Sequence, residues 1–203
     1  MGLGPFAVVD VETSGLRPGR HQVLQIGLVT VDRAGTVLGE WSTLVRLRHF
    51  WNRVGPTHVH GLTRRSLRGA SPADTAFAEL AQRLEGAVFT AHNAGFDAAF
   101  IERAARRAGI ELVLDPRLCT LDLSRRLDPD RALTHGLADV CARYGVPLTA
   151  HHDALADAAA AAAVLPHLLD AHGVTDAAQL DTLYLGRRRV TGPVDADHAG
   201  GVP

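Results

Sequence analysis

Short runs of apolar and β-branched residues open the chain and predict strands. The first covers Phe6–Val11, the next two cover Gln22–Val31 and Thr36–Val45, and a later one covers Ala87–Ala91. The turn sequence Asp32–Gly35 separates the second and third runs, so these two predict a hairpin. The pattern therefore predicts a strand, a hairpin and a later strand.

Helical spacing of apolar residues dominates the rest of the chain. Ser71-Pro72 precedes Ala76, Phe77, Leu80 and Leu84, which predicts a capped amphipathic helix with proline at its first position. The other predicted helices are Phe96–Ala108, Thr120–Leu127, Leu137–Tyr144, Asp153–Ala171 and Ala177–Leu185. Pro166 should kink the long one. Strands first, then alternating helices and strands, predict an α/β domain with a mixed sheet flanked by helices.

Length and composition predict one intracellular domain. The chain has 203 residues, 46% of them hydrophobic, and we assign residues 1–185 to the domain. From Gly186 onward the sequence lacks periodicity, which predicts a disordered tail over 186–203. Cys119 and Cys141 form no CxxC motif, and no signal-peptide pattern opens the chain. The longest apolar stretch, Ala158–Leu165, is too short to span a bilayer. We expect a cytoplasmic protein without a membrane partner.

The charges nearly cancel but are unevenly placed. There are 21 basic residues, all arginine, and 22 acidic ones, which excludes nucleic-acid binding by bulk positive charge. The segment between Glu40 and Asp74 contains no acidic residue and several arginines: Arg46, Arg48, Arg53, Arg64, Arg65 and Arg68. Phe50 and Trp51 lie among them. Composition leaves two interpretations open, a solvated loop or a phosphate-binding surface with bases stacked on aromatics.

Two groups of carboxylates occur where stability gives no reason for them. Asp10 and Glu12 are two apart at the end of the first predicted strand and so share a face. Asp97 would lie in the first turn of a helix, where the helix dipole favours it, and Asn93 could cap that helix. Each group alone is also compatible with solvated carboxylates.

A third group combines histidine and aspartate. Asp157 lies five positions after His152, which would place the two about 140° apart on a helix. To share a site, His152 must therefore precede the helix on a loop, with Asp157 one turn inside it. Asp153 shares a helix face with Asp157 and competes for the same role. The alternative is a helix start with two acidic residues that favour its dipole.

Together, four carboxylates and an imidazole are what a two-cation phosphodiesterase needs. Mg²⁺ or Mn²⁺ prefers oxygen ligands, and two such ions about 3.5–4 Å apart stabilise the attacking and leaving oxygens of an in-line displacement. A histidine can take the proton of the attacking water near neutral pH. Zinc is disfavoured because the histidines lack HExxH spacing and the cysteines are isolated.

These segments resemble the three motifs of the DEDDh 3′–5′ exonuclease family, which includes the proofreading epsilon subunit of bacterial DNA polymerase III, RNase T and oligoribonuclease. The matching segments are Asp10–Leu16, His92–Asp97 and His152 with Asp157. Val59–Thr63 resembles the family's VHGIT segment. The resemblance covers residues 6–170, and His135-Gly136-Leu137 departs modestly from the usual pattern.

The resemblance implies a ribonuclease H-like fold, a five-stranded mixed sheet with helices on both faces. It implies that the metal ligands are Asp10, Glu12, Asp97 and Asp157, with His152 as general base. It also implies that Thr13 and Leu16 meet the 3′-terminal nucleotide and that its pocket is lined by His60, Asn93 and Phe96. Asp153 has no catalytic counterpart in the motif.

The expected activity is release of nucleoside 5′-monophosphates from single-stranded DNA 3′ ends with two Mg²⁺ or Mn²⁺ ions. One alternative is trimming of RNA 3′ ends, and another is a non-catalytic module that binds nucleic acid beside a polymerase. Gln179–Tyr184 faintly resembles a sliding-clamp-binding peptide, but its leucines fit an ordinary helix face better. The resemblance allows either a homodimer or a partnership with a DNA polymerase.

Overall fold

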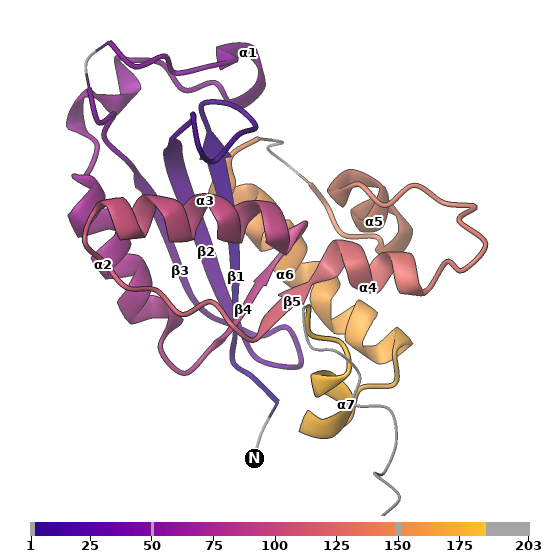
Figure 1. Ribbon diagram of the computed structural model, residues 1–203. Coiled ribbons are helices and arrows are strands. Elements are labelled where there is room, and N and C mark those ends of the chain that lie inside the picture. The colour runs from indigo at the N-terminus through magenta and orange to yellow at the C-terminus, as the bar shows by residue number, and fades with distance from the viewer. Residues whose placement is uncertain (1–2, 50, 149–151, 186–203) are drawn as a thin grey trace, which may run out of the picture.

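A five-stranded mixed sheet forms the centre of the protein. The computed structural model describes residues 3–49, 51–148 and 152–185. The strands are β1 (Phe6–Thr13), β2 (Val23–Val31), β3 (Val37–Leu44), β4 (Val88–Ala91) and β5 (Arg117–Cys119). Their order is β3-β2-β1-β4-β5, with β1 antiparallel to β2 and parallel to β4 (Figure 1). The predicted sheet is confirmed, although the three residues of β5 were too few to be seen in the pattern.

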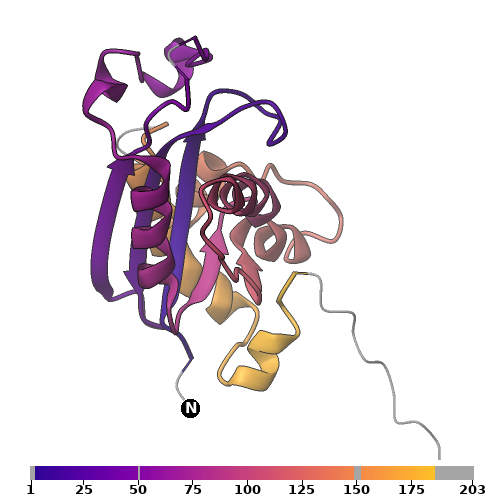
Figure 2. The same cartoon turned by 60° about the vertical axis from the view of Figure 1, so that its left-hand side comes forward.

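Helices cover both faces of the sheet. Helices α2 (Ala73–Leu84) and α3 (Ala94–Arg107) lie in front of it in Figure 1. The other core contains residues of α4 (Thr120–Arg126), α5 (Leu137–Tyr144), α6 (Ala154–Ala171) and α7 (Ala177–Asp181). A short helix α1 (Thr57–His60) and a 3₁₀ turn η1 (Ser66–Gly69) interrupt the arginine-rich segment. Figures 1 and 2 both place α1 and the start of α6 at the end of the sheet where β1 finishes.

The strand period decides which side chains of β1 meet which helices. Phe6 and Val8 pack into the core with α6, whereas Ala7 and Val9 pack into the core with α2 and α3. Because side chains alternate along a strand, the α6 side next receives residues 10 and 12.

Two predicted helix boundaries are wrong. Pro72, not Ser71, occupies the N-cap position of α2, and it makes no side-chain cap bond. Ser71 is instead tied to the end of β3, where its amide donates to the Leu44 carbonyl at 2.9 Å. Helix α7 ends at Asp181 rather than residue 185, because the Leu185 amide donates to the Arg117 carbonyl on β5. Helix α6 continues through Pro166, and the kink there stays a prediction.

Helix α6 is the longest element described and is rich in apolar residues. By length and composition it could cross a membrane, but 56% of that stretch is buried, as in a core helix that covers a sheet. The clamp-like segment is also packed inward, with Leu180, Leu183 and Tyr184 buried in the same core. This packing agrees with the ordinary helix-face interpretation. The predicted tail, 186–203, lies outside the described residues.

Candidate functional site

Strand β1 brings two carboxylates to the α6 side of the sheet. Asp10 lies opposite Gly27 in the β1–β2 ladder, and Glu12 lies opposite Gln25. Glu12 is buried even though it stands near the end of the strand. The solvated strand-end interpretation therefore does not hold for Glu12.

Glycine on β2 lets helix α6 approach these carboxylates. A side-chain carbon at Gly27 would overlap the backbone of Ala154 and Leu155 at the start of α6. The side chain of Gln25 fixes the same helix end, since its Nε2 donates to Asp153 Oδ2 at 3.0 Å and its Oε1 accepts from the Ala154 amide at 3.4 Å. The first turn of α6 is thus held directly over β2, beside β1.

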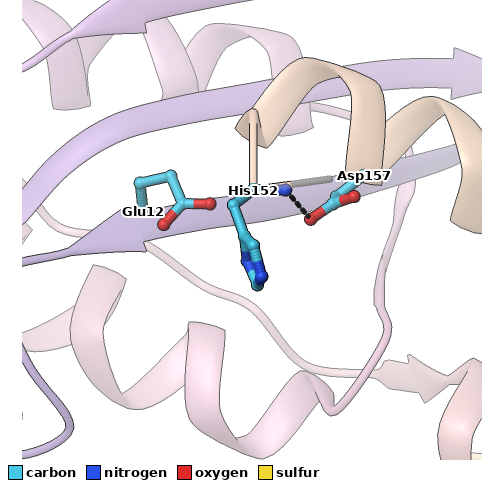
Figure 3. A group of neighbouring side chains, drawn as sticks. All are labelled: Glu12, His152 and Asp157. Atoms are coloured by element: carbon cyan, nitrogen blue, oxygen red, sulfur yellow. Dashed lines mark hydrogen bonds between the residues drawn. The ribbon is translucent and has the colours of Figure 1, made fainter. Parts of the chain in front are cut away.

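This helix start carries the predicted histidine–aspartate pair. His152 precedes α6, exposed, with a left-handed φ of 66°, and Asp157 is buried in the first turn, as predicted. The His152 amide donates to Asp157 Oδ2 at 3.2 Å, and Figure 3 shows Glu12 on the other side of His152. One potential ligand atom each from Glu12, His152 and Asp157 lies within 4.8 Å of the others. A non-glycine residue in the left-handed region is uncommon and often marks a functional site.

Asp153, the competitor of Asp157, has a structural role instead. It is the N-cap of α6, and its Oδ1 accepts from the amides of Leu155 and Ala156, both at 3.1 Å. Its other oxygen accepts from Gln25. Both oxygens are therefore engaged in holding the helix start.

The turn between β4 and α3 supplies the fourth carboxylate. Asp97 is buried in the first turn of α3, as predicted. Asn93 occupies the N-cap position with φ 77°, but its side chain makes no cap bond and is exposed, so the expected cap is wrong. Phe96 is half-buried against Phe100, with ring centroids 4.9 Å apart.

Burial and mutual repulsion raise the pKa of three of these carboxylates. For Asp10 the pKa rises through burial, then through the charges of Asp97, Asp157, Glu12 and Asp153. For Glu12 burial, followed by Asp157 and Asp153, raises the pKa to about 7. For Asp97 burial raises the pKa to about 8, against opposing hydrogen bonds from its own amide and that of Val11.

The same repulsion makes the cluster a fitting cation site. Among the described residues, no arginine forms an ion pair with Asp10, Glu12 or Asp97. Buried like charges without a basic partner are costly unless a cation lies between them. Carboxylate oxygens are the ligands that Mg²⁺ and Mn²⁺ prefer, so the donor set fits such ions.

The residues expected to contact the nucleotide differ in exposure. Leu16 projects from the loop after β1 and is 81% exposed, whereas Thr13 is buried and its Oγ1 donates to the Gly15 carbonyl at 2.9 Å. His60 is buried at the end of α1, and its Nδ1 accepts from the Leu62 amide at 3.0 Å. Burial chiefly lowers the pKa of His60, and the nearby charge of His152 lowers it further.

A partly buried series of hydrogen bonds supports the β4–α3 turn. His92 Nδ1 pairs with Thr120 Oγ1 at 2.9 Å, and its Nε2 pairs with the His135 carbonyl at 3.0 Å. Burial lowers the pKa of His92 to about 4. His135 in turn bonds Ser124 Oγ at 2.9 Å and Asp128 Oδ2 at 3.1 Å.

Ser124, His135 and Asp128 are the residue types of a hydrolytic triad and are linked by hydrogen bonds, but the serine is not accessible to a substrate. Ser124 is 1% exposed, so a substrate does not reach its hydroxyl. Arg143 donates to Ser124 Oγ at 3.0 Å, and Asp128 accepts from the amides of Ala132 and Leu133. This series of hydrogen bonds therefore fastens the loop before α5 to α4.

Sequence reasoning missed two residues that build the site, Gln25 and Gly27. A glycine inside an otherwise β-branched strand pattern signals a bulge or a close backbone approach, so Gly27 could have been found. Gln25 offered no such signal, because its partners are 128 and 129 residues away in the chain.

Comparison with known proteins places this geometry in a family. The Exonuclease family (RNase_T) matches residues 7–165. The chain is 32% identical over 181 residues to "DNA polymerase III PolC-type" of Streptococcus suis and 29% identical over 181 residues to that of Streptococcus sanguinis. In both cases the match covers 87% of this chain and 12% of the relative.

Solved structures with the same fold include two exonucleases. Exonuclease I of E. coli in complex with a dT13 oligonucleotide has a TM-score of 0.73 and 17% identity, over 84% of this chain and 42% of that one. Exonuclease X in complex with 5′ overhanging duplex DNA has a TM-score of 0.67 and 23% identity, over 88% of this chain and 98% of that one. The chain thus spans about an eighth of the PolC-type relatives and less than half of Exonuclease I.

The family match covers most of the chain and includes β1, the β4–α3 turn and the start of α6, the three places that supply the clustered carboxylates and histidine. The chain therefore belongs to the exonuclease family, in its DEDDh group.

Proposed function

We propose that this chain is a metal-dependent 3′–5′ exonuclease that removes nucleoside 5′-monophosphates from single-stranded DNA 3′ ends. The observation that carries the proposal is the convergence of Glu12, His152 and Asp157 within 4.8 Å, together with the buried Asp97 and the half-buried Asp10, whose pKa is raised by burial and then by the charge of Asp97. That combination supplies oxygen ligands for cations and one solvent-accessible imidazole in the same place.

Asp10, Glu12, Asp97 and Asp157 would hold two divalent ions. Such ions, when bound, stabilise the attacking and leaving oxygens of an in-line displacement at phosphorus. The protein contributes a fixed arrangement of oxygens, because β1, α3 and α6 are locked together by two buried cores. Ligands on rigid elements keep the reacting groups in position.

His152 is the group that would move a proton. It stands exposed on the loop before α6, where it can reach a water beside the carboxylates. As the water oxygen forms its bond to phosphorus, the imidazole takes the water proton, and the bond between phosphorus and the 3′ oxygen of the preceding nucleotide breaks. That 3′ oxygen is protonated by solvent, and the terminal nucleotide leaves as its 5′-monophosphate.

The choice of DNA rests on the relatives. The PolC-type relatives are named as DNA polymerases, and the two similar structures were solved with DNA. The same relatives suggest work beside a DNA polymerase, and the cytoplasm stays the proposed location. Co-purification of the tagged protein with polymerase subunits would test this setting, and its elution volume would test for a homodimer.

Labelled oligonucleotides test the activity directly. A 3′-labelled single strand should release labelled mononucleotide at once with Mg²⁺ or Mn²⁺, and a 5′-labelled strand should give a descending ladder. EDTA should stop both reactions. Asp10→Ala should abolish them, and His152→Ala should slow them about 10²–10⁴-fold, the usual contribution of a general base.

Two controls decide between the proposal and its alternatives. A matched RNA strand should be degraded more slowly, and the reverse preference would make RNA the substrate. Cleavage that survives EDTA or the Asp10→Ala substitution would overturn the proposed mechanism. Circular dichroism of each variant separates loss of activity from loss of fold.

A further inference from the structure

Two adjoining hollows lie near the loop that follows β1, on the side away from α6. One, the apolar cavity, has a volume of about 280 Å³ and a floor formed by Val23, Val45, Phe77, Phe100 and Ala104. The other, the basic groove, has a volume of about 460 Å³ and is lined by Arg20, Arg48, Arg53 and Arg107. They share His21, Gln22, Arg48 and Arg107 as a common rim, so they form one continuous surface.

This surface begins next to the candidate catalytic residues. Ser14, which lines the basic groove, is two residues beyond Glu12, or about 7 Å along an extended chain. Gln22 ties the parts together, because its amide donates to Ser14 Oγ at 2.9 Å and its Oε1 accepts from the Arg48 amide at 2.9 Å. Close approach of Gly55 to the Ser14 backbone brings the arginine-rich segment against the same turn.

The charge of the groove is uncompensated. No acidic residue lines either hollow, and no ion pair in the described ranges involves Arg20, Arg48, Arg53 or Arg107. In the part of the chain that the structure describes, Arg107 donates to the Gly19 carbonyl at 3.4 Å. Burial, followed by the like charges of Arg103 and Arg48, lowers the pKa of Arg107.

The groove also presents aromatic surface. Trp51 is 64% exposed at its edge and stacks on His49, with ring centroids 4.6 Å apart and planes within 3°. The apolar cavity, at about 30 Å³ per water molecule, has the volume of about nine waters. Phosphate-binding guanidinium groups beside an apolar hollow and an aromatic face match the alternating phosphates and bases of a single strand.

We propose that the basic groove binds the phosphates of a single-stranded DNA chain upstream of its 3′ end and that the apolar cavity receives one of its bases. This inference rests on the proposed exonuclease function, because it extends the same substrate away from the carboxylates. It also gives Arg20 and Arg107, which lie outside the arginine-rich segment, a part in binding.

Salt dependence of binding tests the role of the arginines. Anisotropy of a fluorescein-labelled oligothymidylate in EDTA measures affinity without cleavage. Arg48→Ala/Arg107→Ala should bind more weakly, and its plot of log affinity against log salt should be shallower by about 1.4, or about 0.7 for each phosphate that is no longer neutralised. Arg83→Ala/Arg106→Ala is the matched control, because it removes equal charge from exposed residues that line neither hollow.

Ala104→Leu tests the cavity without changing charge. Filling the cavity should weaken oligothymidylate binding several-fold while the salt slope stays that of the wild type. Circular dichroism and the unfolding midpoint should match those of the wild type, which confirms that the helix is intact.

Kinetics separates this inference from the proposed function. The p-nitrophenyl ester of thymidine 5′-monophosphate has one phosphate and does not extend to the groove. The ratio of kcat/KM for the oligomer to kcat/KM for this ester should fall at least about ten-fold in Arg48→Ala/Arg107→Ala. An unchanged ratio, or a salt slope equal to that of the control variant, overturns the proposal that the basic groove binds phosphates. Failure of the wild type to cleave either substrate overturns the exonuclease proposal, whereas binding in EDTA still reports on the groove.

Discussion

Gly27 and Asp10 face each other across the β1–β2 ladder, and the absence of a side chain at Gly27 lets the start of α6 lie next to the Asp10 carboxylate. The helix that carries Asp157 can come close to the strand that carries Asp10 and Glu12 only because the neighbouring strand, β2, has no side chain at Gly27. Gly27 is therefore as important to the geometry of the cluster as the ligands themselves.

Gly27→Ala should disturb the cluster without touching a ligand. The added methyl group would overlap the Ala154 backbone, so α6 must shift, at about 1–3 kcal/mol of the free energy of unfolding. A shift of about 1 Å in Asp157 and His152 should lower kcat/KM about 10²-fold. Urea unfolding and steady-state kinetics measure the two effects.

Gly39→Ala provides the control for that substitution. Gly39 is exposed on β3, and nothing lies within 4 Å of an added carbon there. It should retain wild-type activity and stability. Full activity in Gly27→Ala would contradict the role assigned to the close approach.

Substitutions at Asp153 should separate helix capping from metal binding. Asp153→Ala should lower the free energy of unfolding by about 1 kcal/mol, since it removes an N-cap. Asp153→Ser should keep most of that stability, because serine is also a good N-cap. Activity in Asp153→Ser should remain within about ten-fold of the wild type, whereas Asp157→Ala should be inactive.

One outcome of the comparison between Asp153 and Asp157 would contradict the capping role of Asp153. If Asp153→Ser were as inactive as Asp157→Ala while remaining folded, Asp153 would be a ligand rather than a cap. Calorimetric titration with Mn²⁺ reports the same distinction without turnover, because only the loss of a ligand should abolish strong binding.

Stability of the metal-free protein should fall as pH rises. The pKa of Glu12 is about 7 and that of Asp97 about 8 in the folded protein, against about 4.3 and about 3.9 in an unfolded chain. A raised folded pKa means that the folded state binds more protons over this range. The stabilisation that protonation of Glu12 and Asp97 gives the folded state is complete below about pH 4 and is lost as pH rises through about 8.

Urea midpoints in EDTA at about pH 5 and about pH 8 measure this loss. Asp97→Asn should lose less stability over that interval than the wild type, because one titrating carboxylate is gone. Added Mn²⁺ at the higher pH should stabilise the wild type more than the variant. Equal pH slopes for the two proteins would refute the account of the carboxylate cluster.

His60 should contribute to substrate binding through its Nε2 atom. Because Nδ1 accepts from Leu62, the proton of the neutral ring lies on Nε2. His60→Asn keeps an acceptor near Nδ1 but removes the Nε2 donor. It should raise KM for a DNA oligomer about ten-fold or more, the value of a hydrogen bond to a charged group.

The unfolding midpoint distinguishes a role of His60 in substrate binding from a role in stabilising the fold. His60→Asn should unfold near the wild-type midpoint, whereas His60→Ala should unfold earlier, because it leaves the Leu62 amide without its acceptor. An unchanged KM in a folded His60→Asn would remove His60 from the binding site.

Local pattern predicted most of the fold and the members of the cluster. The period of β1 placed Asp10 and Glu12 on one face, and the five-residue spacing placed His152 ahead of the helix that holds Asp157. The local pattern could not predict contacts between segments that are far apart in the sequence. The bonds from Gln25 to Asp153 and Ala154, and the arginine groove built from two separate loops and a helix end, depend on tertiary packing alone.

The positions of Asp10 and Asp157 have a consequence for the chain during its synthesis. Asp10 belongs to the first strand, whereas His152 lies just before α6 and Asp157 in its first turn, and α6 is the last long helix of the core. A growing polypeptide that has not yet released α6 from the ribosome carries only part of the cation cluster. Under the proposed function, nuclease activity would therefore appear only in a finished domain, and partly made chains would be harmless to nearby DNA.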